Sequence, residues 1–185
     1  PGDFTYSQTE ISQMLIDINM AHDCGLEGVV LGAIQQDTTL DVVILQSLSK
    51  RAPSLKKTLR RAIDLVLDPF RAIDIAVDLG FDCILTSAGS PRAIDGITRL
   101  RQMVDHADGR IAIMPGAGVN SANVVQILSQ TGATWVHSSC SAPPLKPTAA
   151  SHRDALTKFG FISGDERKTD ANAIGDLLAA IKQAA

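Results

Sequence analysis

A unit of helix end, glycine and apolar strand recurs along the chain and constrains the fold more than any other feature of the sequence. Three copies align: AHDCGLEGVVLG at 21–32, AVDLGFDCILTS at 76–87 and LSQTGATWVHSS at 128–139. In each copy a glycine (Gly25, Gly80 or Gly132) stands where a helix is expected to end, because glycine readily adopts the left-handed backbone of a helix C-terminus. The pattern predicts a helix followed by a strand, repeated.

Strands and helices are expected to alternate at a regular interval. The predicted strands lie near 28–32, 55–61, 82–86, 110–114 and 134–138. Strand starts therefore recur about every 24 to 28 residues, the length of one βα unit. The predicted helices lie over 9–22, from Asp68-Pro69 onward, from a cap at Asn120 or Ser121 onward, and over 171–184. The proline-containing segment between the fifth strand and the last helix is expected to be a long loop.

This alternation indicates an α/β fold whose parallel strands are covered by helices on the outside. An open doubly wound sheet and a (β/α)₈ barrel both satisfy the pattern, and regular spacing without a change of direction favours the barrel. A closed barrel has eight strands and about 250 residues, whereas this chain of 185 residues has five predicted strands and opens on a helix. We therefore expect one domain, 1–185, forming an incomplete (β/α)₈ barrel of five parallel βα units with the first strands missing.

Composition and charge exclude several function classes. The chain is 45% hydrophobic and 20% charged with a formal net charge of −3, values typical of a soluble globular domain. Basic residues are scattered apart from Lys56-Lys57 and Arg60-Arg61, which argues against a nucleic-acid partner. No apolar run approaches the roughly 20 residues that span a bilayer, and no signal-peptide pattern opens the chain, so we expect no membrane partner and a cytoplasmic location. Three widely spaced cysteines favour reduced thiols.

Polar residues gather at the predicted strand ends, where (β/α)₈ barrels carry their functional sites. They are Arg60, Arg61 and Asp64 after the second strand, Ser87 after the third, Gly116 and Gly118 after the fourth, and Ser138 and Ser139 after the fifth. Arginine side chains, hydroxyls and glycine amides suit a small anion such as phosphate, so we interpret this group as an anion site. The alternative is that an arginine pairs with Asp64 and that the glycines of Gly116-Ala117-Gly118 only make a turn.

Five segments in order along the chain resemble successive motifs of the copper homeostasis protein CutC family. They are PGDFTYS at the start, TLRRAID at 58–64, LGFDCILTSAG at 79–89, GRIAIMPGAGV at 109–119 and ATWVHSS at 133–139. The resemblance implies a (β/α)₈ barrel of about 250 residues, in which this chain begins after the third strand, and a copper-homeostasis role. In two places the chain departs from the family pattern. Arg60 stands where the family has histidine, and the family's Arg-Gly-Gly-Asp-Phe is represented only by Pro1-Gly2-Asp3-Phe4.

A copper site is implied by the resemblance rather than by ligand spacing. Cu(I) prefers soft ligands such as cysteine, methionine and histidine. Cys140 is the only thiol expected near the strand ends, and His137, with Met114 as a further candidate, lies closest to it there. We therefore predict Cys140 and His137 as the metal ligands. Taken alone, His137 also fits a proton-transfer group or a hydrogen-bonded core histidine.

Two functions remain open from the sequence. The first is a cytoplasmic copper-homeostasis protein that binds Cu(I) without turnover. The second is a barrel enzyme that acts on a small phosphorylated metabolite through the anion site. Few soft ligands argue against a tight copper site, whereas the Gly-Ala-Gly turn and the arginine pair argue for an anion. Strand edges left open near 29–31 and Val136 also predict a homo-oligomer.

Overall fold

A sheet of four parallel strands forms the centre of the molecule. The computed structural model describes residues 2–142 and 167–184. The strands are β1 (Gly28–Leu31), β2 (Lys56–Leu59), β3 (Cys83–Thr86) and β4 (Ala112–Pro115). They lie side by side in chain order, each hydrogen-bonded to the next. Because a doubly wound sheet reverses its strand order and a barrel wall does not, this order favours the barrel wall.

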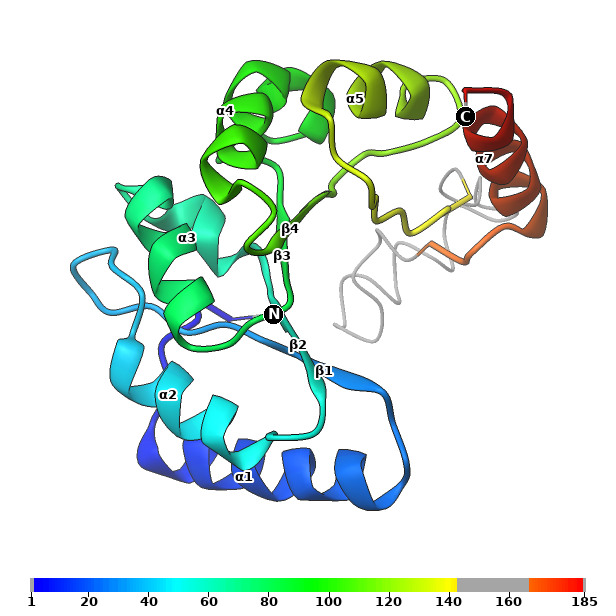
Figure 1. Cartoon of the computed structure of the whole chain (residues 1–185). Coiled ribbons are helices and arrows are strands. Elements are labelled where there is room, and N and C mark those ends of the chain that lie inside the picture. The colour runs from blue at the N-terminus through cyan, green and yellow to red at the C-terminus, as the bar shows by residue number, and fades with distance from the viewer. Residues whose placement is uncertain (1, 143–166, 185) are drawn as a thin grey trace, which may run out of the picture.

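Helices connect the strands and form an arc along one face of the sheet (Figure 1). They are α1 (Gln8–Asp23), α2 (Val42–Arg51), α3 (Pro69–Asp78), α4 (Ile97–Ala107), α5 (Val124–Thr131) and α7 (Ala171–Ala184), with short 3₁₀ helices η1 (Arg61–Leu65) and η2 (Ala93–Gly96) after β2 and β3. The predicted α/β class, with parallel strands and helices outside, is confirmed. None of the helices in the described part of the chain combines the length and apolar character that a bilayer crossing requires.

Local sequence signals explain where most helices begin. In the capping box of α1, the Ser7 hydroxyl accepts from the Glu10 amide, and the Glu10 carboxylate accepts from the Ser7 amide at 2.8 Å. The Asp68 carboxylate accepts from two amides in the first turn of α3, ahead of the predicted proline. Such caps satisfy amides that have no partner inside the helix. The predicted helices at 9–22 and 171–184 are present as α1 and α7.

The start of α5 differs from the prediction. The helix begins at Val124, so the predicted cap at Asn120 or Ser121 is wrong. The Asn120 side-chain oxygen accepts instead from the Ala122 amide at 2.9 Å and closes a turn ahead of the helix. Asparagine favours such turns as readily as helix caps, because both use the same short side-chain acceptor.

The core lies between the helices and the outer face of the sheet. Leu31, Leu59, Ile84 and Ile113 stand in register on this face, one from each strand, and all four are buried. Fully burying each such side chain stabilises the fold by about 1.5–3 kcal/mol. The helices contribute fully buried side chains that include Leu45, Leu48, Ile73, Leu100 and Ile127.

The opposite, inner face of the sheet is only partly covered. Val30, Thr58, Leu85 and Met114 alternate with the core residues along the strands and so point to this face. None of the four is buried, and Val30 on the edge strand is 60% exposed. This face is the one that a closed barrel would turn inward.

The predicted fifth strand at 134–138 is not formed. The segment runs beside β4, and the His137 amide donates to the Pro115 carbonyl at 2.9 Å. A parallel ladder needs alternating donors from both strands, but Pro115 has no N–H to donate. Two residues after Pro115, Ala117 adopts a φ of 76°, and its carbonyl accepts from the Ala93 amide. The backbone therefore turns away from the segment, leaving four strands where we had expected five.

Candidate functional site

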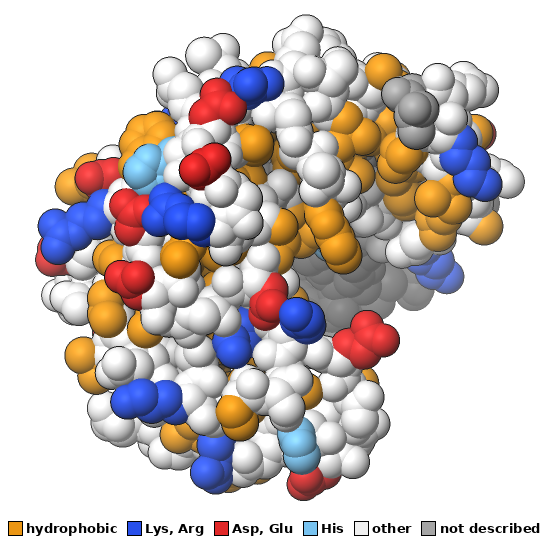
Figure 2. All heavy atoms as spheres, in the orientation of Figure 1, with side chains coloured by type: hydrophobic (Ala, Val, Ile, Leu, Met, Phe, Trp, Pro, Cys, Tyr) orange, Lys and Arg blue, Asp and Glu red, His pale blue; other side chains and the backbone are white. Residues whose placement is uncertain are grey.

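A pocket of about 560 Å³ opens where the strands end, on the inner face of the sheet. The penultimate residue of each strand lines its floor, and the loops that follow the strands line its rim. Figure 2 shows hydrophobic side chains bordering a hollow on this open side of the molecule. Six of the ten predicted site residues line the pocket: Arg60, Arg61, Gly118, His137, Ser138 and Ser139. The other four, Asp64, Ser87, Gly116 and Cys140, do not.

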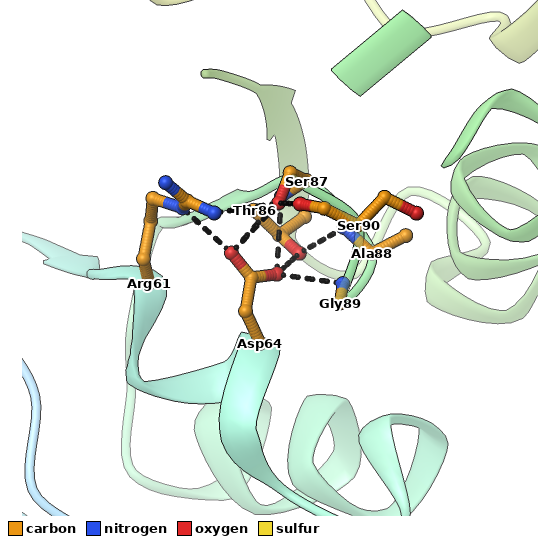
Figure 3. A network of polar contacts seen from close by, with 7 residues as sticks. All are labelled: Arg61, Asp64, Thr86, Ser87, Ala88, Gly89 and Ser90. Atoms are coloured by element: carbon orange, nitrogen blue, oxygen red, sulfur yellow. Dashed lines mark hydrogen bonds and ion pairs between the residues drawn. The ribbon is translucent and has the colours of Figure 1, made fainter. Parts of the chain in front are cut away.

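Asp64 is the centre of a hydrogen-bond network that joins η1 to the loop after β3 (Figure 3). Its carboxylate accepts from Arg61 Nε at 2.7 Å, from Thr86 Oγ1 at 2.5 Å, from Ser87 Oγ at 3.1 Å and from the amides of Ser87 and Gly89. The Asp64 side chain is only 6% exposed. A carboxylate that accepts so many bonds has no lone pair left for a ligand, so Asp64 and Ser87 build the loop and do not contact the pocket.

Arg61 and Arg60 differ in what holds them. Arg61 completes the network, since its second terminal nitrogen donates to Ser87 Oγ at 2.8 Å. The predicted alternative, an arginine paired with Asp64, is therefore confirmed for Arg61. The Arg60 guanidinium instead lies over the Phe4 ring, 5.0 Å from its centroid, and no ion pair joins it to an acidic side chain within 2–142 and 167–184.

The N-terminal segment positions the Arg60 side chain. The Phe4 carbonyl accepts from the Ile34 amide at 3.0 Å, which ties this segment to the loop after β1. Phe4 itself has a φ of 64°, a conformation that an aromatic residue adopts only when its surroundings impose it. Gly32 leaves the space for the Arg60 stem, because a Cβ there would lie 2.6 Å from Arg60 Cγ. Burial raises the pKa of the Tyr6 hydroxyl, and the positive charge of Arg60 opposes that rise.

The two predicted glycines serve different structural purposes. A Cβ on Gly116 would lie 2.5 Å from Leu85 Cδ1, so the glycine leaves room for the Leu85 side chain. Gly118 has a φ of 70°, which only glycine adopts without strain. Its carbonyl accepts from the Asn123 side-chain amide at 2.9 Å. These contacts support the turn that the sequence had left as an alternative.

The loop after β4 uses within the protein two groups that could otherwise donate to an anion, one of them the predicted site residue Ser138. The Asn120 amide donates to Asn123 Oδ1 at 2.9 Å, and the Ser138 hydroxyl donates to the Val119 carbonyl at 2.6 Å. Neither hydrogen is therefore free for a ligand. Within the Gly-Ala-Gly turn, the Gly116 amide also donates inside the protein, to the Thr86 carbonyl at 2.9 Å. An anion in this pocket would therefore depend largely on side chains at the rim.

The three cysteines occupy different environments. Cys140 is half-buried and lines an adjoining pocket of about 400 Å³ between the loop after β4 and α7, whereas His137 and Met114 line the inner-face pocket. The two pockets share Gly118, Ser138 and Ser139. Burial raises the pKa of the Cys83 thiol to about 11. Cys24 is exposed at the end of α1. Within the described ranges, no group of three or more histidine, cysteine or acidic side chains converges in a way that could hold a metal ion.

Sequence reasoning missed Phe4, Gly32 and the apolar floor of the pocket. The alternation of side chains along a strand could have identified part of the floor. Thr58 lies two residues before Arg60 and therefore points to the same face of the sheet, and Val30 is its partner in the neighbouring strand. No local pattern indicates that Phe4 contacts Arg60, since they lie far apart in the chain and their contact depends on the register of β1 against β2.

A model of the CutC family matches residues 1–142. The chain belongs to the CutC family. The CutC family protein of Agrobacterium fabrum is 39% identical over 176 residues, which are 95% of this CutC chain and 68% of the relative. The copper homeostasis protein cutC homolog of Mus musculus is 36% identical over 159 residues, 86% of this chain and 58% of the relative. The resemblance inferred from the five motifs is thereby confirmed.

Solved structures agree with the fold of this CutC chain. CutC from Streptococcus agalactiae superposes with a TM-score of 0.71 at 30% identity, over 74% of this chain and 67% of that one. The aldolase QR15 superposes with a TM-score of 0.56 at 18% identity, over 74% of this chain and 63% of that one, which indicates a shared fold alone. Together with the four-stranded parallel wall, these matches confirm the predicted (β/α)₈-type fold, incomplete in this chain.

Proposed function

We propose that this protein acts in cytoplasmic copper homeostasis by binding Cu(I), with Cys140 as its main ligand. The observation that carries the proposal is membership of the CutC family, whose Mus musculus member is named as a copper homeostasis protein. All three cysteines are free. Free thiols are the usual state in the reducing cytoplasm, and thiolate is a soft ligand of the kind that selects Cu(I).

Among the thiols, Cys140 is best suited to this role. Metals bind the thiolate form, and a pKa of about 11 keeps Cys83 protonated at neutral pH. Cys24 is exposed at the C-terminal end of α1 and lines neither pocket, so no neighbouring wall of a cavity would enclose a metal ion there. Cys140 lines the wall of a pocket that Arg167 and Asp176 also line, so a metal ion can reach its sulfur from the cavity. Because His137 lines the other pocket, its role as a copper ligand stays a prediction and the proposal rests on Cys140.

The test is an anaerobic Cu(I) titration of the reduced protein in competition with a chromophoric Cu(I) chelator. We expect Cys140→Ser to weaken binding by at least about tenfold, which corresponds to about 1.4 kcal/mol. Cys24→Ser is the matched control, since it removes an exposed thiol away from both pockets, and it should leave the affinity unchanged. His137→Ala reports whether the histidine contributes.

Two results would contradict the proposal. Equal affinities for the wild type and Cys140→Ser would remove Cys140 from the site. A wild type that cannot take Cu(I) from a weak chelator at all would show that copper homeostasis in this protein does not depend on direct binding.

A further inference from the structure

We propose that the inner-face pocket binds a small phosphomonoester, with the phosphate held by Arg60 at the rim and the organic part lying over the apolar floor. The inference concerns the pocket next to that of the copper proposal and depends on Arg60, which lines only the inner-face pocket, whereas Cys140 lines only the adjoining one. It rests on the charge of the lining, the fixed position of Arg60 and the division of the pocket into a polar rim and an apolar floor.

The charge of the pocket lining favours an anion. Arg60, Arg61 and His137 line the pocket, and no aspartate or glutamate is among the described residues that do so. Arg61 is neutralised by its 2.7 Å ion pair with Asp64, which leaves Arg60 as the uncompensated positive charge. A cation would be repelled here, whereas phosphate accepts charge-assisted hydrogen bonds from a guanidinium.

Arg60 is held in place before any ligand arrives. Its guanidinium lies over the Phe4 ring, 5.0 Å from the ring centre, and its stem fills the space that Gly32 leaves beside it. No acceptor within 2–142 and 167–184 takes a hydrogen bond from the Arg60 guanidinium, so its N–H groups remain able to donate to a ligand. A side chain already fixed in this way loses little conformational entropy on binding. The contacts that fix Arg60 therefore favour binding of a ligand as well as local packing.

A hydroxyl donor stands on the other side of the rim. The Ser139 hydroxyl oxygen accepts from the Ser141 hydroxyl at 2.8 Å, so its own proton remains available to a ligand. The Ser138 hydroxyl is committed to the Val119 carbonyl and acts by holding this segment in position. Arg60 follows β2, whereas Ser139 follows the segment beside β4, so the two donors approach the pocket from opposite sides.

The floor determines the class of ligand. Val30, Leu85 and Met114 present apolar side chains to the pocket, and Thr58 is the polar residue among these strand positions. A volume of about 560 Å³ falls within the range of small-molecule sites. Inorganic phosphate alone would leave this apolar surface exposed to water, whereas a phosphomonoester with a ring or short alkyl body would cover it.

The experiment compares phenyl phosphate, inorganic phosphate and phenol as probes of the full chain, by calorimetry and amide chemical shifts. We expect phenyl phosphate to bind several-fold more tightly than inorganic phosphate, and phenol not to bind. Arg60→Gln should weaken phenyl phosphate binding by about tenfold or more. Arg101→Gln is the matched control, because Arg101 is an exposed arginine on α4, paired with Asp105 and outside the pocket, and it should leave binding unchanged.

The role of Phe4 is tested by rescue. Phe4→Leu should weaken binding several-fold, and Phe4→Trp should restore it, because tryptophan is the stronger partner in a cation–π contact. A purely structural role would not follow this order. Circular dichroism and thermal melts establish that each variant is folded.

Three results would overturn the inference: no binding of phenyl phosphate at millimolar concentration, equal affinities for Arg60→Gln and Arg101→Gln, or equal affinities for phenyl phosphate and inorganic phosphate. Cys140→Ser should bind phenyl phosphate as the wild type does, and Arg60→Gln should bind Cu(I) unchanged. Failure of this inference and failure of the copper proposal are therefore separate observations.

Discussion

At the scale of single residues, the network around Asp64 shows how a strand-end motif can serve structure instead of binding. The carboxylate is nearly buried and accepts from groups on η1, on β3 and in the loop after β3. It therefore sets the position at which the chain leaves β3. Arg60, the neighbour of Arg61 in sequence, lies over Phe4 instead of pairing with Asp64. Both arginines line the pocket, but different contacts hold them.

We expect Asp64→Asn to destabilise the fold by about 3 kcal/mol. One carboxylate oxygen accepts from Arg61 and the Ser87 hydroxyl, and the other accepts from Thr86 and the Gly89 amide, so a side-chain amide with one oxygen leaves buried donors unpaired. Urea denaturation measures the change. Asp105→Asn is the control, since it breaks an exposed pair with Arg101 and should cost about 0.5 kcal/mol or less. A loss for Asp64→Asn as small as that of the control would show that water replaces the network.

At the scale of secondary-structure elements, two glycines in regular structure occupy opposite environments. Gly28 lies in β1, where a Cβ would be 2.6 Å from the Lys56 carbonyl oxygen of β2. Gly175 lies inside α7, where a Cβ would meet nothing within 4 Å. The first glycine permits the close pairing of two strands, and the second only increases the flexibility of the unfolded chain.

We therefore expect alanine to act in opposite directions at these two sites. Gly175→Ala should stabilise the protein by about 0.5–1 kcal/mol, the usual gain of alanine over glycine in a helix. Gly28→Ala should destabilise it, because the backbone carbonyl that it meets cannot move without disturbing the β1–β2 pairing. Thermal and urea unfolding of both variants test the pair, and a stabilised Gly28→Ala would contradict the close approach.

At the scale of the whole molecule, the four-stranded wall leaves its inner face and the free edge of β1 open among the described residues. The edge strand carries unpaired backbone groups beside the exposed side chain of Val30, and such edges favour pairing with another chain. The segment beside β4 covers the other edge only in part, through the bond from His137 to Pro115. We therefore propose that the chain self-associates through these surfaces.

Sedimentation velocity measures this association. Val30→Lys should shift the protein toward the monomer, because a charge on the inner face at the edge of the sheet opposes pairing. Val43→Lys is the control: Val43 is 76% exposed and lies on α2, on the helical side of the sheet (Figure 1). A wild type that is monomeric over the accessible concentration range would contradict the proposal.

Several features followed from the sequence because they depend on neighbours in the chain. The cap at Asp68, the helix 171–184 and the left-handed glycines Gly25, Gly80 and Gly132 are set by interactions within a few residues. The parallel α/β class followed from the period of the strands, and the family from motifs that lie in order along the chain. In each case the information lies in short stretches of sequence and in their spacing.

The site was decided by the tertiary structure. Register brings Arg60 over Phe4 and beside Gly32, and it sets Pro115, which has no N–H, opposite the segment that would have been the fifth strand. Cys140 has a positive φ, and its amide donates to the Ser138 hydroxyl. In this backbone conformation His137 and Cys140, three residues apart, line different pockets. Sequence spacing thus determined which residues reach the strand ends. Only the packed backbone decided which way each one points, because direction depends on contacts between segments that are distant in the chain.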